Sequence, residues 1–169
     1  LRSQPFGLAA LAGRIRAVLE GQEGFLPYTL DCCGKKIRVG ERTLVMGILN
    51  VTPDSFSDGG KYFDYGAALE KARQMTADGA DIIDLGGEST RPGYSPVDVE
   101  EELSRILPVL KRLVKEIDVP VSIDTTKAEV ARQALEEGAC IINDQLSLHG
   151  DPAMAGVAAA YGAPLVLMH

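Results

Sequence analysis

From residue 43 onward the sequence alternates between short apolar runs and longer amphipathic segments. The apolar runs are continuous rather than alternating, as strands buried on both faces of a sheet require, and they cover residues 43–50, 81–87, 119–125, 139–144 and 164–169. The segments between them have helical spacing and cover residues 65–78, 98–117, 126–137 and 151–161. Glycines follow three of these helices, at Gly79, Gly138 and Gly162, as at helix carboxyl ends. This order predicts a parallel sheet with right-handed crossovers.

Two α/β architectures have this order, an open doubly wound sheet and a (β/α)8 TIM barrel. Polar side chains end every apolar run: Asn50, Asp84 with Glu88, Asp124, Asn143 with Asp144, and His169. A doubly wound sheet gathers its site at one switch point, whereas a barrel collects groups from many strand ends. We therefore predict a TIM barrel. Such a barrel needs about 250 residues, so we expect these 169 residues to supply its first half.

Residues 1–27 precede the barrel region, and we expect them to form an N-terminal extension that is helical. Residues 28–169 are then the N-terminal half of the barrel, and they open with a hairpin at Tyr28–Gly40 whose turn lies near Gly34. The three cysteines form neither an even disulfide framework nor a CxxC pair. We expect them to be reduced, with Cys32 and Cys33 on opposite faces of a strand.

The net charge of -7 argues against a nucleic-acid groove as the main binding surface. No apolar run reaches the length of about 20 residues that a membrane helix needs. The N-terminal segment carries arginines within its helical pattern and has no clear cleavage site, so it does not read as a signal peptide. We expect a cytoplasmic protein that binds neither nucleic acid nor membrane.

Two loops carry candidate binding residues. The first, residues 50–60, is rich in Pro, Gly and small polar residues, which is typical of an active-site loop or of an ordinary solvated connection; Phe56 favours the first interpretation. The second, residues 86–93, has paired glycines that allow close approach of a ligand, and hydroxyl and guanidinium donors suited to an anion. The alternative is a long turn whose Arg91 pairs with a surface acid.

Asp124 and Asn143 end neighbouring predicted strands. A buried carboxylate is costly unless hydrogen-bond donors satisfy it, so Asp124 either contacts a ligand or caps the helix that follows. Asn143 raises the same question with an amide, which both donates and accepts. Together the two side chains could form hydrogen bonds with the edge of a flat, amide-rich heterocycle.

In order and spacing, the segments MGILNVTPDSFSDGG, DIIDLGGESTRPG, VPVSIDT and IIND resemble the dihydropteroate synthase family, from about Thr29 to His169. The family has a TIM barrel with its site at the C-terminal face. With Mg²⁺, its members condense 6-hydroxymethyl-7,8-dihydropterin pyrophosphate with p-aminobenzoate to 7,8-dihydropteroate and pyrophosphate. The resemblance thus implies a sulfonamide-targeted transferase of folate biosynthesis that acts on small molecules and is a homodimer when full length.

The resemblance also assigns roles to residues that match the family's motifs. It implies that Asn50 contacts Mg²⁺ and pyrophosphate. Thr90 matches a threonine that contacts the pyrophosphate, and Arg91 lies beside it. Asp124 and Asn143 match the pair that hydrogen-bonds the pterin ring.

Phe56 and Pro92 match positions that enclose the p-aminobenzoate ring, and Asp58 matches an acid near the reacting methylene. The candidate catalytic residues implied by the resemblance are therefore Asp58 and Arg91. The sequence departs from the family at Asp144–Ser147, where a valine or isoleucine, a serine and a glycine are common; this puts the shape of the fourth loop in question. It also ends at His169, before the family's later basic residues, so we expect no turnover from these residues alone.

Two other functions fit the same strand-end acid and asparagine. One is a pterin-binding methyltransferase that acts on methyltetrahydrofolate and a corrinoid, but it gives no reason for the NVTPDSFSDGG and ESTRPG loops. The other is a half-barrel that binds without catalysis.

Overall fold

The computed structural model describes residues 13, 16, 27–52, 65–88 and 96–168. Two compact units make up the chain, one of Leu1–Thr29 and Arg38–Thr43, the other of Leu30–Ile37 and Leu44–His169. The core and the candidate site described below lie within the second unit. The predicted helical extension falls almost wholly outside the described residues.

The elements follow one another in the predicted order. A two-stranded sheet of β1 (Tyr28–Cys32) and β2 (Lys35–Val39) comes first, and the repeating strands and helices follow it. They are β3 (Met46–Asn50), α2 (Tyr65–Ala77), β4 (Ile82–Gly86), α3 (Val99–Glu116), β5 (Val121–Asp124), α4 (Ala128–Glu136), β6 (Ile141–Asp144), α5 (Met154–Tyr161) and β7 (Leu165–Leu167). In the described part of the chain no helix is long and apolar enough to cross a membrane.

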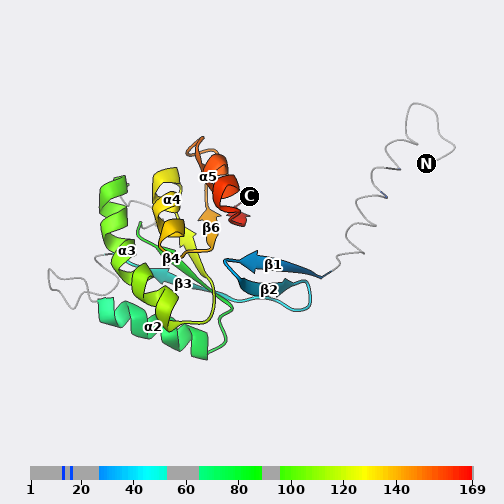
Figure 1. The fold of residues 1–169 in the computed structure, drawn as a ribbon, viewed down its shortest axis with the longest axis horizontal. Helices are drawn as coiled ribbons and strands as arrows, with labels where there is room; N and C mark the ends of the chain where they lie inside the picture. The colour runs from blue at the N-terminus through cyan, green and yellow to red at the C-terminus, as the bar shows by residue number, and fades with distance from the viewer. Residues whose placement is uncertain (1–12, 14–15, 17–26, 53–64, 89–95, 169) are drawn as a thin grey trace. The chain divides into compact units, whose positions relative to one another are not determined.

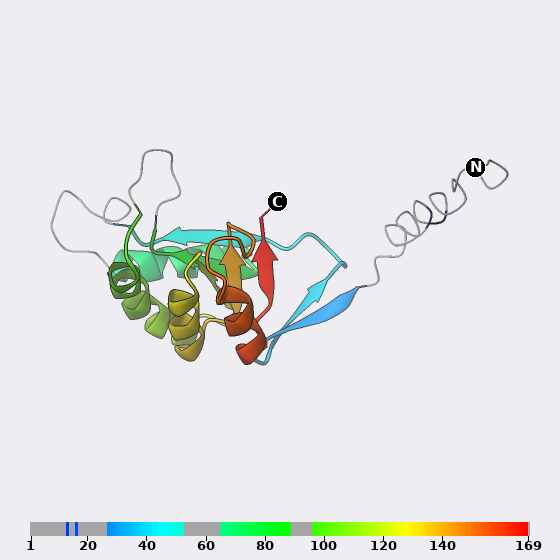
Figure 2. The same cartoon turned by 90° about the horizontal axis from the view of Figure 1, so that it is seen from above.

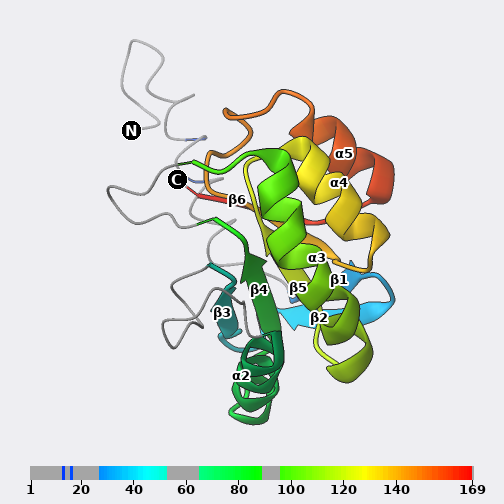
Figure 3. The ribbon, with the colours of Figure 1, turned by 90° about the vertical axis from the view of Figure 1, so that its left-hand side faces the viewer.

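The five later strands form one parallel sheet in the order β3-β4-β5-β6-β7 (Figure 1). Helices α2 to α5 lie on the same side of this sheet, as Figures 2 and 3 show from two directions. A doubly wound sheet reverses its strand order and carries helices on both faces. Sequential order with one covered face is the geometry of a barrel segment, so the predicted architecture is confirmed over these strands.

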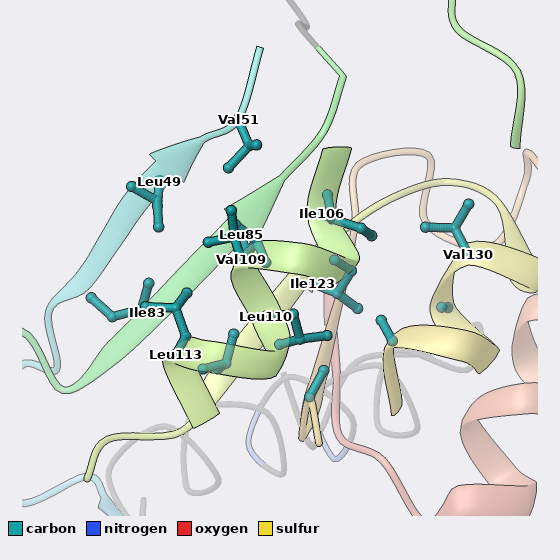
Figure 4. Close-up of a cluster of buried hydrophobic side chains, with 14 of the residues drawn as sticks. Leu49, Val51, Ile83, Leu85, Ile106, Val109, Leu110, Leu113, Ile123 and Val130 are labelled. Carbon is teal, nitrogen blue, oxygen red and sulfur yellow. The ribbon is translucent and has the colours of Figure 1, made fainter. Parts of the chain in front are cut away.

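The core lies between the sheet and its helices. Alternate strand residues, including Leu49, Ile83, Leu85 and Ile123, point into this layer and are fully buried. They meet the apolar face of α3, where Ile106, Val109, Leu110 and Leu113 are equally buried (Figure 4). Because successive strand residues face opposite sides of a sheet, the residues between them point to the inner face of the barrel.

The hairpin differs from the prediction in its turn. Cys33 and Gly34 form the turn with φ values of 55° and 84°, so Cys33 lies in the turn and not in the strand. Cys32 is buried in β1, whereas Cys33 is exposed. Lys35 Nζ donates to the carbonyls of Ile117 and Val119 at 3.1 and 3.0 Å, which ties the hairpin to the segment entering β5.

Candidate active site

Four residues lie in register at the carboxyl end of the sheet. Asn50 pairs with Gly86, Gly86 with Asp124, and Asp124 with Asn143. Paired residues of neighbouring parallel strands face the same side, so the three polar side chains share the inner face of the barrel. The structure therefore brings together Asn50, Asp124 and Asn143, as predicted from the strand ends.

Gly86 separates the two ends of this row. A Cβ atom at this position would lie 3.3 Å from Asn50 Oδ1 and 3.3 Å from Asp124 Oδ2. Those contacts are tighter than side chains normally make, so any larger residue would crowd both groups. Gly86 thus allows the amide and the carboxylate to approach the strand from either side.

The carboxyl group of Asp124 is partly buried, and its pKa is raised. Burial raises its pKa to about 6, the nearby Asp84 adds to the rise, and hydrogen bonding to Gln145 opposes it. Gln145 Nε2 reaches both carboxylate oxygens, at 2.9 and 2.8 Å. The acid sits at the edge of a pocket lined by Glu88, Glu102, Asp124, Thr125, Thr126 and Gln145. Perturbed acids beside a pocket are typical of functional sites.

Asp124 does not cap the helix that follows. Helix α4 begins at Ala128, two residues later than predicted, and its N-cap Lys127 makes no side-chain capping bond. The Ala128 N–H instead donates to Asp151 Oδ2 at 2.9 Å, and the Lys127 N–H donates to Thr125 Oγ1 at 3.2 Å. The carboxylate of Asp124 therefore has no capping role, and its contact with a ligand stays a prediction.

The Asn143 side chain is hydrogen-bonded to a second acid, Asp84, which lies deeper in the barrel. Its Nδ2 donates to Asp84 Oδ2 at 2.9 Å, and Asp84 is only 3% exposed. Burial raises the pKa of Asp84, while the neighbouring Ser122 hydroxyl and the Asn143 amide lower it. Sequence reasoning placed Asp84 among the polar strand ends but gave it no role.

A lysine bridges two acids beside the pocket. Lys127 Nζ bonds Glu102 at 2.6 Å and also bonds Glu88. The Glu102 side chain is 1% exposed although it lies in the first turn of α3. This ion pair fixes Glu88, which lies in the described part of the second loop. Nothing in the sequence singled out Glu102 from the acids around it.

The fourth loop is shaped by Asp144. Its buried carboxylate accepts the N–H groups of Leu146 and Leu148 at 2.9 and 2.7 Å. Ser147 and Leu148 adopt positive φ values of 51° and 67°. In the same atypical segment Gln145 contacts Asp124, which the sequence did not predict.

The remaining predicted site residues lie outside the described residues. They are Phe56, Asp58, Thr90, Arg91 and Pro92. Their roles stay predictions. Among the described residues no cluster of three or more His, Cys, Asp or Glu side chains could hold a metal ion by itself.

The family model described as "Pterin binding enzyme" matches residues 46–169. The chain belongs to this pterin-binding family. The dihydropteroate synthase of Bacillus subtilis is 60% identical over 129 residues, which cover 76% of this chain and 45% of that protein. A probable bifunctional folylpolyglutamate synthase/dihydropteroate synthase of Halobacterium salinarum is 52% identical over 169 residues, covering 100% of this chain and 20% of that protein.

Among solved structures, the dihydropteroate synthase of Xanthomonas albilineans with 4-aminobenzoic acid superposes on this pterin-binding chain with a TM-score of 0.80. It is 47% identical, and the match covers 85% of this chain and 52% of that one. The chain spans about half the length of the first curated relatives it matches. Both comparisons agree with the prediction of a half-barrel.

Proposed function

We propose that these residues form the first half of a dihydropteroate synthase, a transferase that joins a dihydropterin methylene to the nitrogen of p-aminobenzoate. The observation that carries the proposal is the row of Asn50, Asp124 and Asn143 along the carboxyl ends of neighbouring strands. Membership of the pterin-binding family, and relatives named for this activity, support the assignment.

The ring-binding end of the row consists of Asp124 and Asn143. A carboxylate and an amide oxygen accept hydrogen bonds from ring N–H and amino groups. With a pKa of about 6, Asp124 is mainly ionised at neutral pH. Its negative charge also stabilises positive charge that develops on the pterin as the leaving group departs.

The leaving-group end of the row is Asn50. Mg²⁺ in phosphate-transferring sites is usually held by one or two protein oxygens together with phosphates and waters. A single amide oxygen of Asn50, which lies beside Gly86 at the carboxyl end of the sheet, fits that role. The ion would neutralise the departing pyrophosphate. Thr90 and Arg91 would add donors to the same anion.

The reaction needs no covalent bond to the protein. The bond between the methylene carbon and the pyrophosphate oxygen breaks, and that oxygen takes the electron pair. The lone pair of the p-aminobenzoate nitrogen forms the new carbon–nitrogen bond, and the nitrogen then loses a proton. Phe56 and Pro92 would enclose the p-aminobenzoate ring, and Asp58 would lie near the reacting carbon.

The inner face of the sheet leaves room for the rest of a barrel. β3 and β7 are the edge strands of the described sheet. Apolar side chains lie exposed on these strands, including Ile48 at 60% and Leu167 at 48%. A closed barrel pairs such edges and covers such side chains. We further propose that the full-length protein is cytoplasmic and, as the family resemblance suggests, a homodimer.

The experiment compares the 169-residue chain with the full-length protein that carries it. The full-length protein should form dihydropteroate from the two substrates, and the isolated chain should not. Methyltetrahydrofolate with a corrinoid should give no product in either case. Product from the second substrate pair alone would replace the proposal with a methyltransferase.

Asp124→Asn in the full-length protein tests the ring-binding role. It places a donor opposite ring donors, and a mispaired buried group costs about 1–3 kcal/mol. The pterin dissociation constant, measured by calorimetry, should therefore rise roughly tenfold to a hundredfold. An unchanged constant would remove Asp124 from the site.

A further inference from the structure

The hydrogen bond between Asn143 and Asp84 passes across a strand. Asp84 lies in β4 and Asn143 in β6, with β5 between them. Asp84 pairs with Ser122, two residues before Asp124, so it lies one step deeper in the barrel than the row of site residues. The 2.9 Å bond from Asn143 Nδ2 therefore points down into the barrel, away from its mouth.

The chemistry of a carboxylate decides which end of the amide points down. An ionised carboxylate can only accept hydrogen bonds, and of the two ends of an amide only the NH2 group donates. Turning the Asn143 side chain over would set its carbonyl oxygen against the carboxylate and leave Asp84, which is 3% exposed, without that donor. An unsatisfied buried group of this kind is strongly disfavoured.

No other described group replaces this donor. The Ser122 hydroxyl interacts with the carboxylate, but loosely. Within the described residues, neither Ser122 Oγ nor Asp84 Oδ1 has a partner that meets strict hydrogen-bond geometry. The Asn143 amide is thus the main donor that satisfies Asp84.

We propose that Asp84 is a positioning residue, which locks the Asn143 amide so that its Oδ1 is the atom presented to the pterin ring. This inference rests on the proposed function, because it takes the ligand to be a pterin. Asp124, beside Asn143 in the same row, is also an acceptor. Two adjacent acceptors select a ring edge that carries N–H or NH2 donors over one that carries carbonyls.

Asp84→Asn in the full-length protein is the first test. The replacement keeps the size of the side chain but either accepts or donates, so the Asn143 amide is no longer held in one direction. We expect the dissociation constant of 6-hydroxymethyl-7,8-dihydropterin pyrophosphate to rise about tenfold, and the Michaelis constant for p-aminobenzoate to stay within about twofold. Ser122→Ala is the matched control. It removes the loose contact and leaves the Asn143 bond, so pterin affinity should be unchanged.

A double-mutant cycle separates positioning from general damage. If Asp84 acts through Asn143, Asp84→Asn should have little further effect on pterin affinity in an Asn143→Ala background. A tenfold loss in that background as well would overturn the inference. Unchanged affinity in the single variant would overturn it too.

A measurement on the unsubstituted protein covers the case in which Asp84→Asn fails to fold. The side-chain NH2 resonance of Asn143, followed by NMR in ligand-free protein, should shift as Asp84 titrates, at a pH above the ordinary range of aspartate. If this resonance does not respond to pH, Asp84 does not hold the Asn143 amide in one orientation. If the full-length protein neither binds the pterin nor turns over, the proposed function is wrong. If the enzyme is active but the effects of Asp84→Asn and Asn143→Ala on pterin affinity are additive, only this inference is wrong.

Discussion

Replacing Gln145 by valine should shift the pH dependence of pterin binding. The Gln145 amide donates to both oxygens of Asp124 and so favours the charged form of this acid. Valine has an apolar side chain that donates no hydrogen bond. Without the amide, the pKa of Asp124 must rise above its present value of about 6. Binding that needs the carboxylate should then be lost at higher pH than before.

The size of the shift follows from the contact. A hydrogen bond to a charged group contributes about 1.5–3 kcal/mol. One NH2 group makes this contact, and Asp124 is only partly buried, so the lower end of the range applies. One pKa unit corresponds to about 1.4 kcal/mol, which predicts a rise of about one unit. The weakening should approach tenfold on the acid side and vanish above about pH 8.

Calorimetric titration of the pterin substrate between about pH 5 and pH 8.5 would measure this shift in the full-length protein. Gln145→Glu removes the donor and adds a negative charge. In this variant, the pH below which pterin binding weakens should therefore rise further than in Gln145→Val. Gln133→Val is the matched control, since Gln133 bonds Glu129 on the exposed surface of α4. The reasoning would be refuted if the pH below which pterin binding weakens were unchanged, or lower, in Gln145→Val.

Phe56→Leu should raise the Michaelis constant for p-aminobenzoate several-fold, since part of an aromatic contact contributes on the order of 1 kcal/mol. Bulkier sulfonamides should lose more affinity than the substrate, and an equal loss of pterin affinity would argue against a role of Phe56 in enclosing the p-aminobenzoate ring. Lys127→Met should lower stability by about 3 kcal/mol, because it leaves the buried carboxylate of Glu102 unpaired. Adding Glu102→Gln should recover most of that loss in thermal unfolding; no recovery would refute the account. Iodoacetamide should label exposed Cys33 in the folded protein well before buried Cys32, as peptide mass spectrometry would show; equal rates would contradict the structure.

The predictable part of the fold is the part governed by local pattern. Continuous apolar runs identified β3 to β7, and Gly79, Gly138 and Gly162 marked the ends of three helices, where they adopt positive φ. The common edge of Asn50, Asp124 and Asn143 followed because carboxyl ends of parallel strands meet. The start of α4 was predicted too early, because a turn closed by Thr125 precedes the helix.

The contacts around the site were not predictable in the same way. Gln145 reaches Asp124 across two neighbouring strand ends, and Ser147 and Leu148 beyond it take left-handed conformations; no local sequence pattern predicts either feature. Glu102 lies in a run of three acids, and only the orientation of α3 against the sheet decides which of them is buried. Such contacts depend on how distant segments pack.

The alternation of core and site residues along β4 also favours one register of pairing between the strands. Ile83 and Leu85 point into the helical layer, and Asp84 lies between them on the opposite face. A slip of one residue would exchange the faces, driving a carboxylate among the helices and an isoleucine into the polar interior. A slip of one residue is therefore penalised on both sides of the sheet at once. Variants that make the interior of the barrel apolar should, for this reason, fold with less exact strand pairing even where they appear to improve the core.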